Sequence, residues 1–141
     1  MNVATVQFID NKTEFIAKSA AFTDLLMGLM AAKIQSSIIT SGRVPLLPVS
    51  TKWAQRGALR QSIRSVKLAV GMYAVTAGTG SPAAAYAAAQ EAGTTRGHVM
   101  KNYSTPGTGA HWFRDAIDTT IAQAPELIQR AKNAVGLEDI V

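Results

Sequence analysis

The order of hydrophobic and polar positions predicts one long helix in the first third of the chain. Asp10-Asn11 is a typical helix start with Glu14 as its capping partner, and apolar residues recur at helical spacing to about Thr40. The resulting apolar stripe contains Phe15, Phe22, Leu25, Leu26, Leu29 and Ile34, widened by Met27 and Met30. We expect this helix to lie across a sheet. Gly28 and Ala31 would also permit a helix–helix contact between subunits.

The segments on either side of this helix are predicted to be extended. Residues 3–9 (VATVQFI) have the β-branched and aromatic character of a short strand, and an arm that pairs with a neighbouring subunit would show the same pattern. Ser41-Gly42 ends the helix. Pro45 and Pro48 then favour an extended loop over residues 43–50.

The middle of the chain predicts a short helix followed by two strands. Residues 58–65 form the predicted helix, with Leu59 and Ile63 on one face. Residues 66–72 and 73–79 are the predicted strands. The first has the alternation of a half-buried strand, in which Val66, Leu68 and Val70 alternate with Lys67, Ala69 and Gly71.

An alanine-rich segment and a polar loop come next. Residues 83–91 have high helix propensity. Residues 94–109 show no periodic pattern, and a loop of such length usually has a function or is mobile. Thr108 is placed to cap a helix that begins near Ala110.

Two apolar stripes predict helices at the C-terminal end. The first stripe contains Trp112, Phe113, Ala116, Ile117 and Ile121. Pro125 either kinks this helix or starts a second one, which continues to Gly136, and residues 137–141 are expected to be a loose tail. The predicted fold class is therefore α+β. A long N-terminal helix and C-terminal helices would pack on a small, mainly antiparallel sheet.

Composition favours a single domain that functions as a subunit of an assembly. A chain of 141 residues with 48% hydrophobic residues is enough for a single core, and we treat residues 1–141 as one domain. Only 16% of the residues are charged, which is low for a globular protein. Because an assembly covers surface that a monomer must keep solvated, this shortage of charge favours a subunit.

Several protein classes are disfavoured by what the sequence lacks. It has no Cys, hence no disulfide framework and no thiolate chemistry, and its two histidines are too few for an ordinary structural zinc site. The first residues do not resemble a signal peptide. The apolar run from Ala20 to Ala32 is interrupted by Asp24 and is too short to span a bilayer. We expect no membrane partner, and synthesis in a cytoplasm.

The net charge of +5 is concentrated in the middle of the chain. No acidic residue lies between Asp24 and Glu91, and Arg56, Arg60 and Arg64 are spaced to share one helix face. Such a row is either a solvated helix face or a surface for an acidic partner or DNA. The residues proposed to face a partner or DNA are Lys52, Arg56, Arg60, Arg64, Lys67, Arg96, His98 and Lys101.

No catalytic constellation emerges from the remaining candidates. The glycine-rich loop at residues 78–82 lacks the Lys-Ser/Thr ending of a phosphate-binding loop, which excludes a nucleotide site of that kind. His98 and His111 have no nearby partner of metal-ligand spacing. Asp115 and Asp118 could form an acid/base pair, but carboxylates in the first turns of a helix are common for dipole reasons alone. We predict no enzyme, no cofactor and no metal.

Three short motifs are spread over the middle and the C-terminal part of the chain. Residues 57–63 (GALRQSI) are similar to the signature T-G-x-L-x-x-S-I, with Arg56 in place of the usual Thr. Residues 86–94 (YAAAQEAGT) resemble Y-A-x-x-x-E-x-G-T with one extra residue, and residues 112–117 (WFRDAI) take the place of P-x-F-L-x-x-A. The motif residues are Gly57, Leu59, Ser62, Ile63, Tyr86, Glu91, Gly93, Trp112 and Phe113. In this order the motifs resemble a family of head–tail joining or tail-completion proteins of long-tailed bacteriophages, also described as neck or minor capsid proteins.

The resemblance implies an α+β subunit that forms a ring of six or twelve copies at the neck of the virion. Its partners would be further copies of itself and the adjacent connector and tail-tube proteins, with genomic DNA passing through the channel. The family has no catalytic residues to carry over. In family context, part of residues 83–91 would be a strand or a helical turn. The alternative function is a basic protein that binds nucleic acid independently of sequence, which the pI of 9.8 favours.

Overall fold

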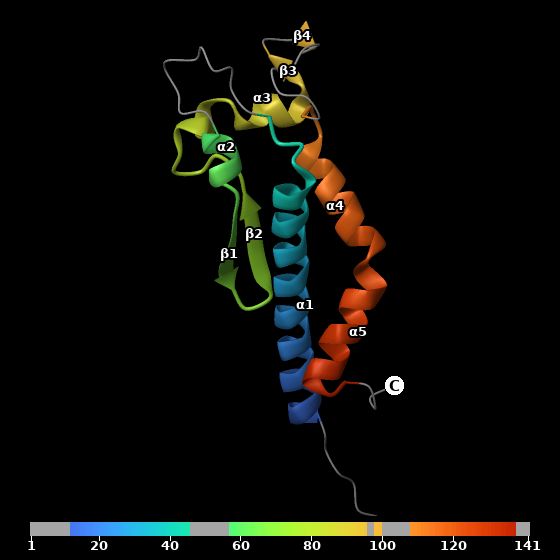
Figure 1. Cartoon of the computed structure of the whole chain (residues 1–141). Helices are drawn as coiled ribbons and strands as arrows, with labels where there is room; N and C mark the ends of the chain where they lie inside the picture. Colours follow the sequence, from blue (N-terminus) through green and yellow to red (C-terminus); the bar gives the residue numbers. More distant parts are fainter. Residues whose placement is uncertain (1–11, 46–56, 96–97, 100–107, 138–141) are drawn as a thin grey trace, which may run out of the picture.

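The computed structural model describes residues 12–45, 57–95, 98–99 and 108–137, and it confirms the predicted α+β class (Figure 1). The chain has a long N-terminal helix, later helices and a two-stranded antiparallel sheet. Three predicted segments lie wholly or mostly outside the described residues: the arm at residues 3–9, the proline-containing loop at residues 43–50, of which 43–45 are described, and the tail at residues 137–141, of which residue 137 is described.

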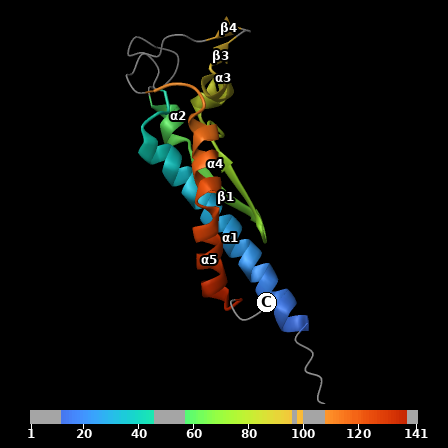
Figure 2. The same cartoon turned by 90° about the vertical axis from the view of Figure 1, so that its right-hand side faces the viewer.

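Helix α1 (Lys12–Ser41) is the middle layer of the molecule (Figures 1 and 2). A hairpin of strands β1 (Arg64–Ala69) and β2 (Met72–Thr76) lies on one side of α1. Helices α4 (Trp112–Ala122) and α5 (Ala124–Val135) lie along the other side. The predicted packing of α1 across a sheet is therefore correct, and the C-terminal helices cover its opposite flank.

The long helix ends where the sequence predicts. It continues to Ser41, and Gly42 follows with a φ of 66°, a left-handed conformation that glycine adopts without strain. Near its start, Glu14 and Lys18 form an ion pair of 3.0 Å. The two small residues that would have allowed a contact between subunits are covered within the chain, because Gly28 lies against the ring of Tyr73 and Ala31 is buried.

Helix α1 is long and apolar enough to cross a membrane by length and composition, which is weak evidence because core helices of soluble proteins share both properties. In this chain Asp24, near the middle of the helix, accepts hydrogen bonds from Lys67 and from the backbone of Gly71. The absence of a membrane partner stays a prediction.

The hairpin confirms the two predicted strands with shifted bounds. Arg64 pairs with Thr76 and Lys67 pairs with Tyr73, and an irregularity between Lys67 and Ala69 precedes the turn. Gly71 in the turn has a φ of 73°. The sheet has only these two strands, so the outer edge of each strand has no strand partner among the described residues.

Two predicted helices are corrected. The helix expected over residues 58–65 ends at Gln61, because α2 (Ala58–Gln61) is a single turn and β1 already begins at Arg64. The helix expected over residues 83–91 is divided at Tyr86 into a 3-10 turn, η1 (Pro82–Ala85), and α3 (Ala87–Ala92). Tyr86 has φ −131°, which interrupts the helix.

The segment that the sequence predicts to be a loop without periodic structure contains two short strands. Strands β3 (Thr94–Thr95) and β4 (His98–Val99) pair in antiparallel fashion, while residues 100–107 lie outside the described chain. The following helix begins at Trp112 rather than near Ala110, after His111 in a left-handed conformation. Pro125 starts a second helix, α5, because Gln123 separates it from α4.

The hydrophobic core lies at the C-terminal end of α1. Ile38 from that helix, Leu59 and Ile63 from the motif segment, and Trp112 from α4 are each at most 2% exposed. The predicted stripe towards the start of α1 is less covered, and Phe15 is 47% exposed. The chain therefore has a dense core at one end and a thinner, elongated body at the other.

Candidate functional site

The three motif segments meet at the core end of the molecule. Leu59 and Ile63 from the first motif and Trp112 from the third belong to one buried cluster, and Tyr86 and Phe113 pack against it. The rings of Trp112 and Phe113 lie 5.9 Å apart at a tilt of 54°, a favourable arrangement for two aromatic rings. Burial raises the pKa of the Tyr86 hydroxyl above its usual value. The motif residues thus form the framework of this end.

Ser62 connects the first motif to the loop that follows the hairpin. Its hydroxyl donates to the carbonyl of Leu59 at 2.7 Å and accepts from the backbone N–H of Gly78 at 2.6 Å. Ser62 is 6% exposed, so both groups are satisfied away from water. The Ser62 side chain therefore caps the C-terminus of α2 and also holds the backbone of the loop at Gly78 in place.

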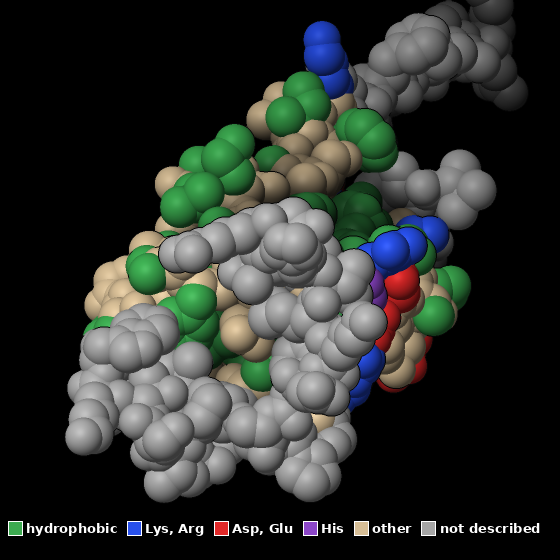
Figure 3. Space-filling model, turned by 90° about the horizontal axis from the view of Figure 1, so that it is seen from above, with side chains coloured by type: hydrophobic (Ala, Val, Ile, Leu, Met, Phe, Trp, Pro, Cys, Tyr) green, Lys and Arg blue, Asp and Glu red, His purple; other side chains and the backbone are tan. Residues whose placement is uncertain are grey.

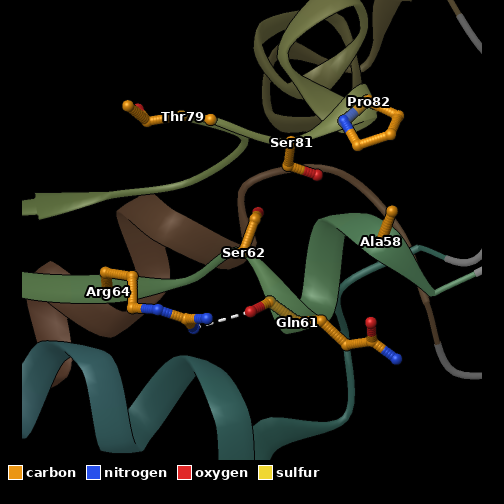
Figure 4. A pocket seen from close by; sticks show the side chains of 8 residues that line it. Ala58, Gln61, Ser62, Arg64, Thr79, Ser81 and Pro82 are labelled. Carbon is orange, nitrogen blue, oxygen red and sulfur yellow. Dashed lines mark hydrogen bonds between the residues drawn. The ribbon is translucent and has the colours of Figure 1, made fainter.

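An open cleft of about 260 Å³ lies between the first motif and this loop (Figure 4). One wall comes from α2 and the start of β1, and the other from Thr79–Pro82. Arg64 stands at its edge, where its guanidinium donates to the carbonyls of Gln61 and Ile63 at 2.6 and 3.1 Å. The lining offers hydroxyls, an amide and one guanidinium, and it contains no carboxylate or imidazole for proton transfer.

Glu91 caps the N-terminus of α4. Its carboxylate accepts from the backbone N–H groups of Phe113 and Arg114 at 2.8 and 3.0 Å, and its own carbonyl accepts from the N–H of His111 at 2.8 Å. The first amides of a helix lack partners within the helix, and a negative charge suits that end. The N-cap residue is His111 rather than Thr108, and Glu91 caps two of the first amides from a distant segment.

Arg43 fastens the end of α1 to the start of α4. Its guanidinium pairs with the carboxylate of Asp115 and donates to the carbonyl of Ala110 at 3.2 Å. Asp115 is thus committed to an ion pair, which weakens its candidacy as an acid/base partner of Asp118. Among the described residues, no cluster of three side chains is suited to hold a metal ion.

The predicted basic row is not a row on one helix. Arg60 lies on α2 and donates to the carbonyls of Val44 and Gly42 at 2.7 and 3.0 Å, which supports the chain just after α1. Arg64 lies on β1. Lys52, Arg56, Arg96 and Lys101 lie outside the described residues, and of His98 only the backbone, in β4, is described. Whether these side chains face DNA or an acidic protein stays a prediction.

Lys67 has an acidic partner, Asp24, even though no acidic residue lies near it in the sequence. Its ammonium lies 2.8 Å from the carboxylate of Asp24, which also accepts from the backbone N–H of Gly71 at 2.8 Å. The hydrogen bond from Gly71 and the one from Lys67 hold the pKa of Asp24 below its usual value, and the hydrogen bond to Asp24 raises the pKa of Lys67. The sequence alone did not predict that Asp24 positions the hairpin. The signal that could have indicated this role is a single carboxylate within an apolar helical stripe.

The expected half-buried pattern of the first strand is not found, because every residue of β1 except Ser65 is exposed. The ammonium of Lys67 reaches Asp24 of α1, although the lysine side chain stays 47% exposed, and Val66, Leu68 and Val70 are 45%, 61% and 71% exposed. Met72 on the partner strand is 56% exposed. We call these four side chains the hairpin patch. The hairpin and its turn therefore present four large hydrophobic side chains to their surroundings.

Comparison with models of protein families, with characterised proteins and with solved structures gives no match to this chain. The family resemblance consequently depends on the motif residues themselves.

Proposed function

We propose that this protein is a structural subunit of a bacteriophage neck, where an oligomeric ring joins or completes the tail at the head–tail interface. One observation carries the proposal. The three motif segments that resemble the neck family, far apart in the sequence, meet in one buried framework made by Leu59, Ile63 and Trp112 and by the caps of Ser62 and Glu91. In a protein whose function is assembly, short motifs are expected to be the residues that hold its fold together, as these do.

Two further features support an assembly role. The charged fraction of the chain is only 16%, and the hairpin exposes four large hydrophobic side chains. Exposed apolar patches rimmed by polar groups commonly mark interaction surfaces. The pairing of Lys67 with Asp24 and of Arg60 with backbone carbonyls uses positive charges within the chain, which favours a protein-facing role for the hairpin over a DNA-facing one.

The test is quantitative mass spectrometry of purified virions from a phage that encodes this chain. We expect the chain to be present at one half or one copy per copy of the portal protein. Absence from particles, with the chain abundant in infected cells, would refute a virion role.

A basic protein that binds nucleic acid without sequence preference is the second candidate, favoured by the net charge of +5. It predicts DNA binding by the isolated chain that weakens steeply as salt is raised, with a slope set by the number of neutralised phosphates. A filter-binding titration at several salt concentrations separates this function from the first.

A further inference from the structure

The cleft between the first motif and the loop after the hairpin is lined by a single charged residue of the described chain, Arg64 (Figure 4). The Nη1 atom of Arg64 donates to the carbonyls of Gln61 and Ile63 at 2.6 and 3.1 Å. Both carbonyls belong to the turn that leads into β1, so the turn itself orients the guanidinium. A side chain that is already oriented loses less freedom when it binds a ligand.

Most of the donors of this guanidinium are left over. A guanidinium has five N–H groups in a planar fork, and the two bonds to carbonyls use only those of Nη1. The edge formed by Nε and Nη2 has no acceptor among the described residues, and Arg64 forms no ion pair with a described carboxylate. Such an edge can make the two parallel N–H···O bonds by which arginine binds a carboxylate or a phosphate.

Neighbouring polar groups of the cleft are also able to donate. The hydroxyl of Ser81 accepts from the backbone N–H of Ala83 at 3.1 Å, which leaves its proton for another partner. The side chains of Thr79 and Gln61 form no hydrogen bond within the described chain. Ser62 and Ser81 point towards one another in Figure 4, but the hydroxyl of Ser62 is already used as both donor and acceptor. The cleft therefore offers unused donors around one positive charge.

This set of groups matches one carboxylate. A carboxylate is planar and carries one negative charge, so it fits the fork of Arg64 and balances its charge. A phosphate monoester carries about −1.5 to −2 charges at pH 7 and would leave negative charge unbalanced beside a single cation. The cleft is lined by no acidic residue of the described chain that would repel a carboxylate.

The size of the cleft indicates a group that belongs to a larger partner. Its volume is about 260 Å³, below the roughly 300–1,000 Å³ of pockets that enclose a small-molecule ligand, and it is open to solvent. Ala58 and Pro82 add an apolar wall that suits the methylene groups of a glutamate side chain. DNA would need several available cations, whereas Arg60 and Lys67 are held by groups of the chain itself.

We propose that this cleft is a binding site for one side-chain carboxylate of an acidic peptide segment. Arg64 would hold the carboxylate through its Nε and Nη2 atoms, and the hydroxyls of Ser81 and Thr79 would donate to it. This inference goes beyond the proposed function, because it concerns the chemistry of one cleft and does not depend on a place in a virion.

Nuclear magnetic resonance on the full, ¹⁵N-labelled chain tests the site directly. The probe is acetyl-Gly-Glu-Gly-amide, added at pH 7 and constant ionic strength. We expect saturable shifts of the Arg64 Nε–H signal and of the Ser81 amide. Acetyl-Gly-Gln-Gly-amide has the same shape without the charge, and it should bind about tenfold or more weakly because the charge-assisted pair is lost. Equal binding of the two peptides, or an Arg64 Nε–H signal that does not move, overturns the proposal.

Substitutions separate the fork from its charge. Arg64→Lys keeps the positive charge but cannot make two parallel bonds, so we expect the peptide to bind about tenfold more weakly. The matched control is Arg114→Gln, because Arg114 is exposed on α4, lies outside the cleft and has no ion pair in the described chain. It should bind the peptide like the wild type. Full affinity in Arg64→Lys, or an equal loss in Arg114→Gln, refutes the site.

A loss of affinity in Arg64→Lys counts only if the variant is folded, which thermal unfolding followed by circular dichroism shows. Thr79→Val provides a second variant, because valine keeps the shape of threonine and removes the hydroxyl. We expect it to weaken binding about threefold or more, as the loss of one hydrogen bond would. An unchanged affinity in this variant contradicts the donor role of Thr79 and with it the proposed set of contacts.

Two further titrations identify the source of the carboxylate. Acetate has the same charged group without the methylenes of glutamate, and it should bind about fourfold or more weakly because it leaves the apolar wall uncovered. Inorganic phosphate should also bind more weakly than the peptide. Acetate that binds as tightly as the peptide, or phosphate that binds more tightly, overturns the assignment to an acidic peptide. A chain that is present in virions but binds no peptide would refute this site alone and leave the proposed function intact.

The view in Figure 3 locates other charged side chains at an edge of the molecule, where acidic and basic groups lie side by side. Charges that neutralise one another on a surface do not select a ligand of one sign. The cleft of Arg64 differs, because its one charge has no described counter-charge. The control variant Arg114→Gln therefore distinguishes binding in the cleft from a general attraction of acidic peptides to a chain of net charge +5.

Discussion

Glu91 and Phe113 are joined by the hydrogen bond that begins α4. The Oε2 atom of Glu91 accepts from the backbone N–H of Phe113 at 2.8 Å, while Oε1 accepts from that of Arg114 at 3.0 Å. One carboxylate thus satisfies two amides that have no partner within the helix. Because Glu91 lies on α3, this bond also fixes the position of α4 relative to the alanine-rich segment. A motif residue with no catalytic role has a clear structural one.

We expect Glu91→Ala to destabilise the chain by about 1–2 kcal/mol, the usual cost of losing a side-chain cap. Glu91→Gln should cost less, because the amide oxygen still accepts one of the two bonds. Chemical denaturation followed by circular dichroism measures both. Glu14→Gln is the control, since Glu14 is also near a helix start but forms an exposed ion pair worth only about 0.3–0.5 kcal/mol. Equal losses in Glu91→Ala and the control would show that the cap contributes little.

Gly78 and Gly80 form a matched pair in the loop after the hairpin. Both have positive φ, at 87° and 69°. A Cβ added at residue 78 would lie 2.9 Å from the Cβ of Ala87 and 3.2 Å from the carbonyl oxygen of Ala83, whereas one added at residue 80 meets nothing within 4 Å. Substitution by alanine would therefore cost conformational energy at both positions, but it would create a steric clash only at residue 78.

Gly80→Ala should therefore cost about 1–2 kcal/mol, the penalty of the left-handed conformation alone. Gly78→Ala should cost this amount and about 1–3 kcal/mol more, because Ala87 of α3 and the backbone of η1 would have to move. Free energies of unfolding from urea titration compare the two variants directly. Equal destabilisation would mean that the loop relaxes freely and that the close approach to η1 has no energetic weight.

Local pattern was sufficient where an element is determined by its own residues. The apolar spacing and the glycine at residue 42 located the end of α1, and Pro125 marked the start of α5. The predicted helix to Ser65 was wrong because local spacing did not determine where this helix ends. Leu59 and Ile63 are both buried, as predicted, but their burial does not require a continuous helix. The helix ends between them, and the hydroxyl of Ser62 closes its last turn.

Contacts between distant residues were beyond the reach of local pattern. Alternation along β1 predicted a half-buried strand, yet Val66 and Leu68 are 45% and 61% exposed. An irregularity between Lys67 and Ala69 breaks the alternation, and Asp24, 43 residues before Lys67, binds the lysine side chain to α1. Glu91 likewise caps a helix that begins some twenty residues later, although spacing alone predicted Thr108 for this role. Residues far apart in sequence decided the orientation of both the hairpin and α4.

Ser62 offers a sharp test of the motif framework. In Ser62→Ala, the buried N–H of Gly78 loses its acceptor, which should cost about 1–3 kcal/mol. The control is Ser36→Ala, at an exposed position of α1, where a change within about 0.5 kcal/mol is expected. Thermal unfolding of the two variants provides the comparison. A Ser62→Ala variant as stable as the control would show that the cleft admits water to the Gly78 amide.

Asp24 predicts a particular dependence of stability on pH. Because its pKa is lowered in the folded chain, its contribution is fully present above the unfolded value near 3.8 and is lost as pH falls through the lower folded value. Lys67 has a raised pKa, so its contribution is present below 10.5 and is lost as pH rises through the higher folded value. Asp24→Asn should therefore be less stable than the wild type by a constant amount at neutral pH. The difference should shrink in strong acid and in strong base.

Urea titrations at pH 3, 5, 7 and above 10.5 measure this difference, with Asp118→Asn as a control, because Asp118 is a carboxylate with no ion pair in the described chain. Added salt should reduce the Asp24→Asn effect strongly. The asparagine oxygen can still accept from Gly71 in the variant, so the main loss is the exposed ion pair with Lys67, which salt screens. A difference that is the same at pH 3 and pH 7 would mean that the charge of Asp24 does not hold the hairpin. The fixed orientation of the hairpin patch would then need another cause, such as the contact between Tyr73 and Gly28.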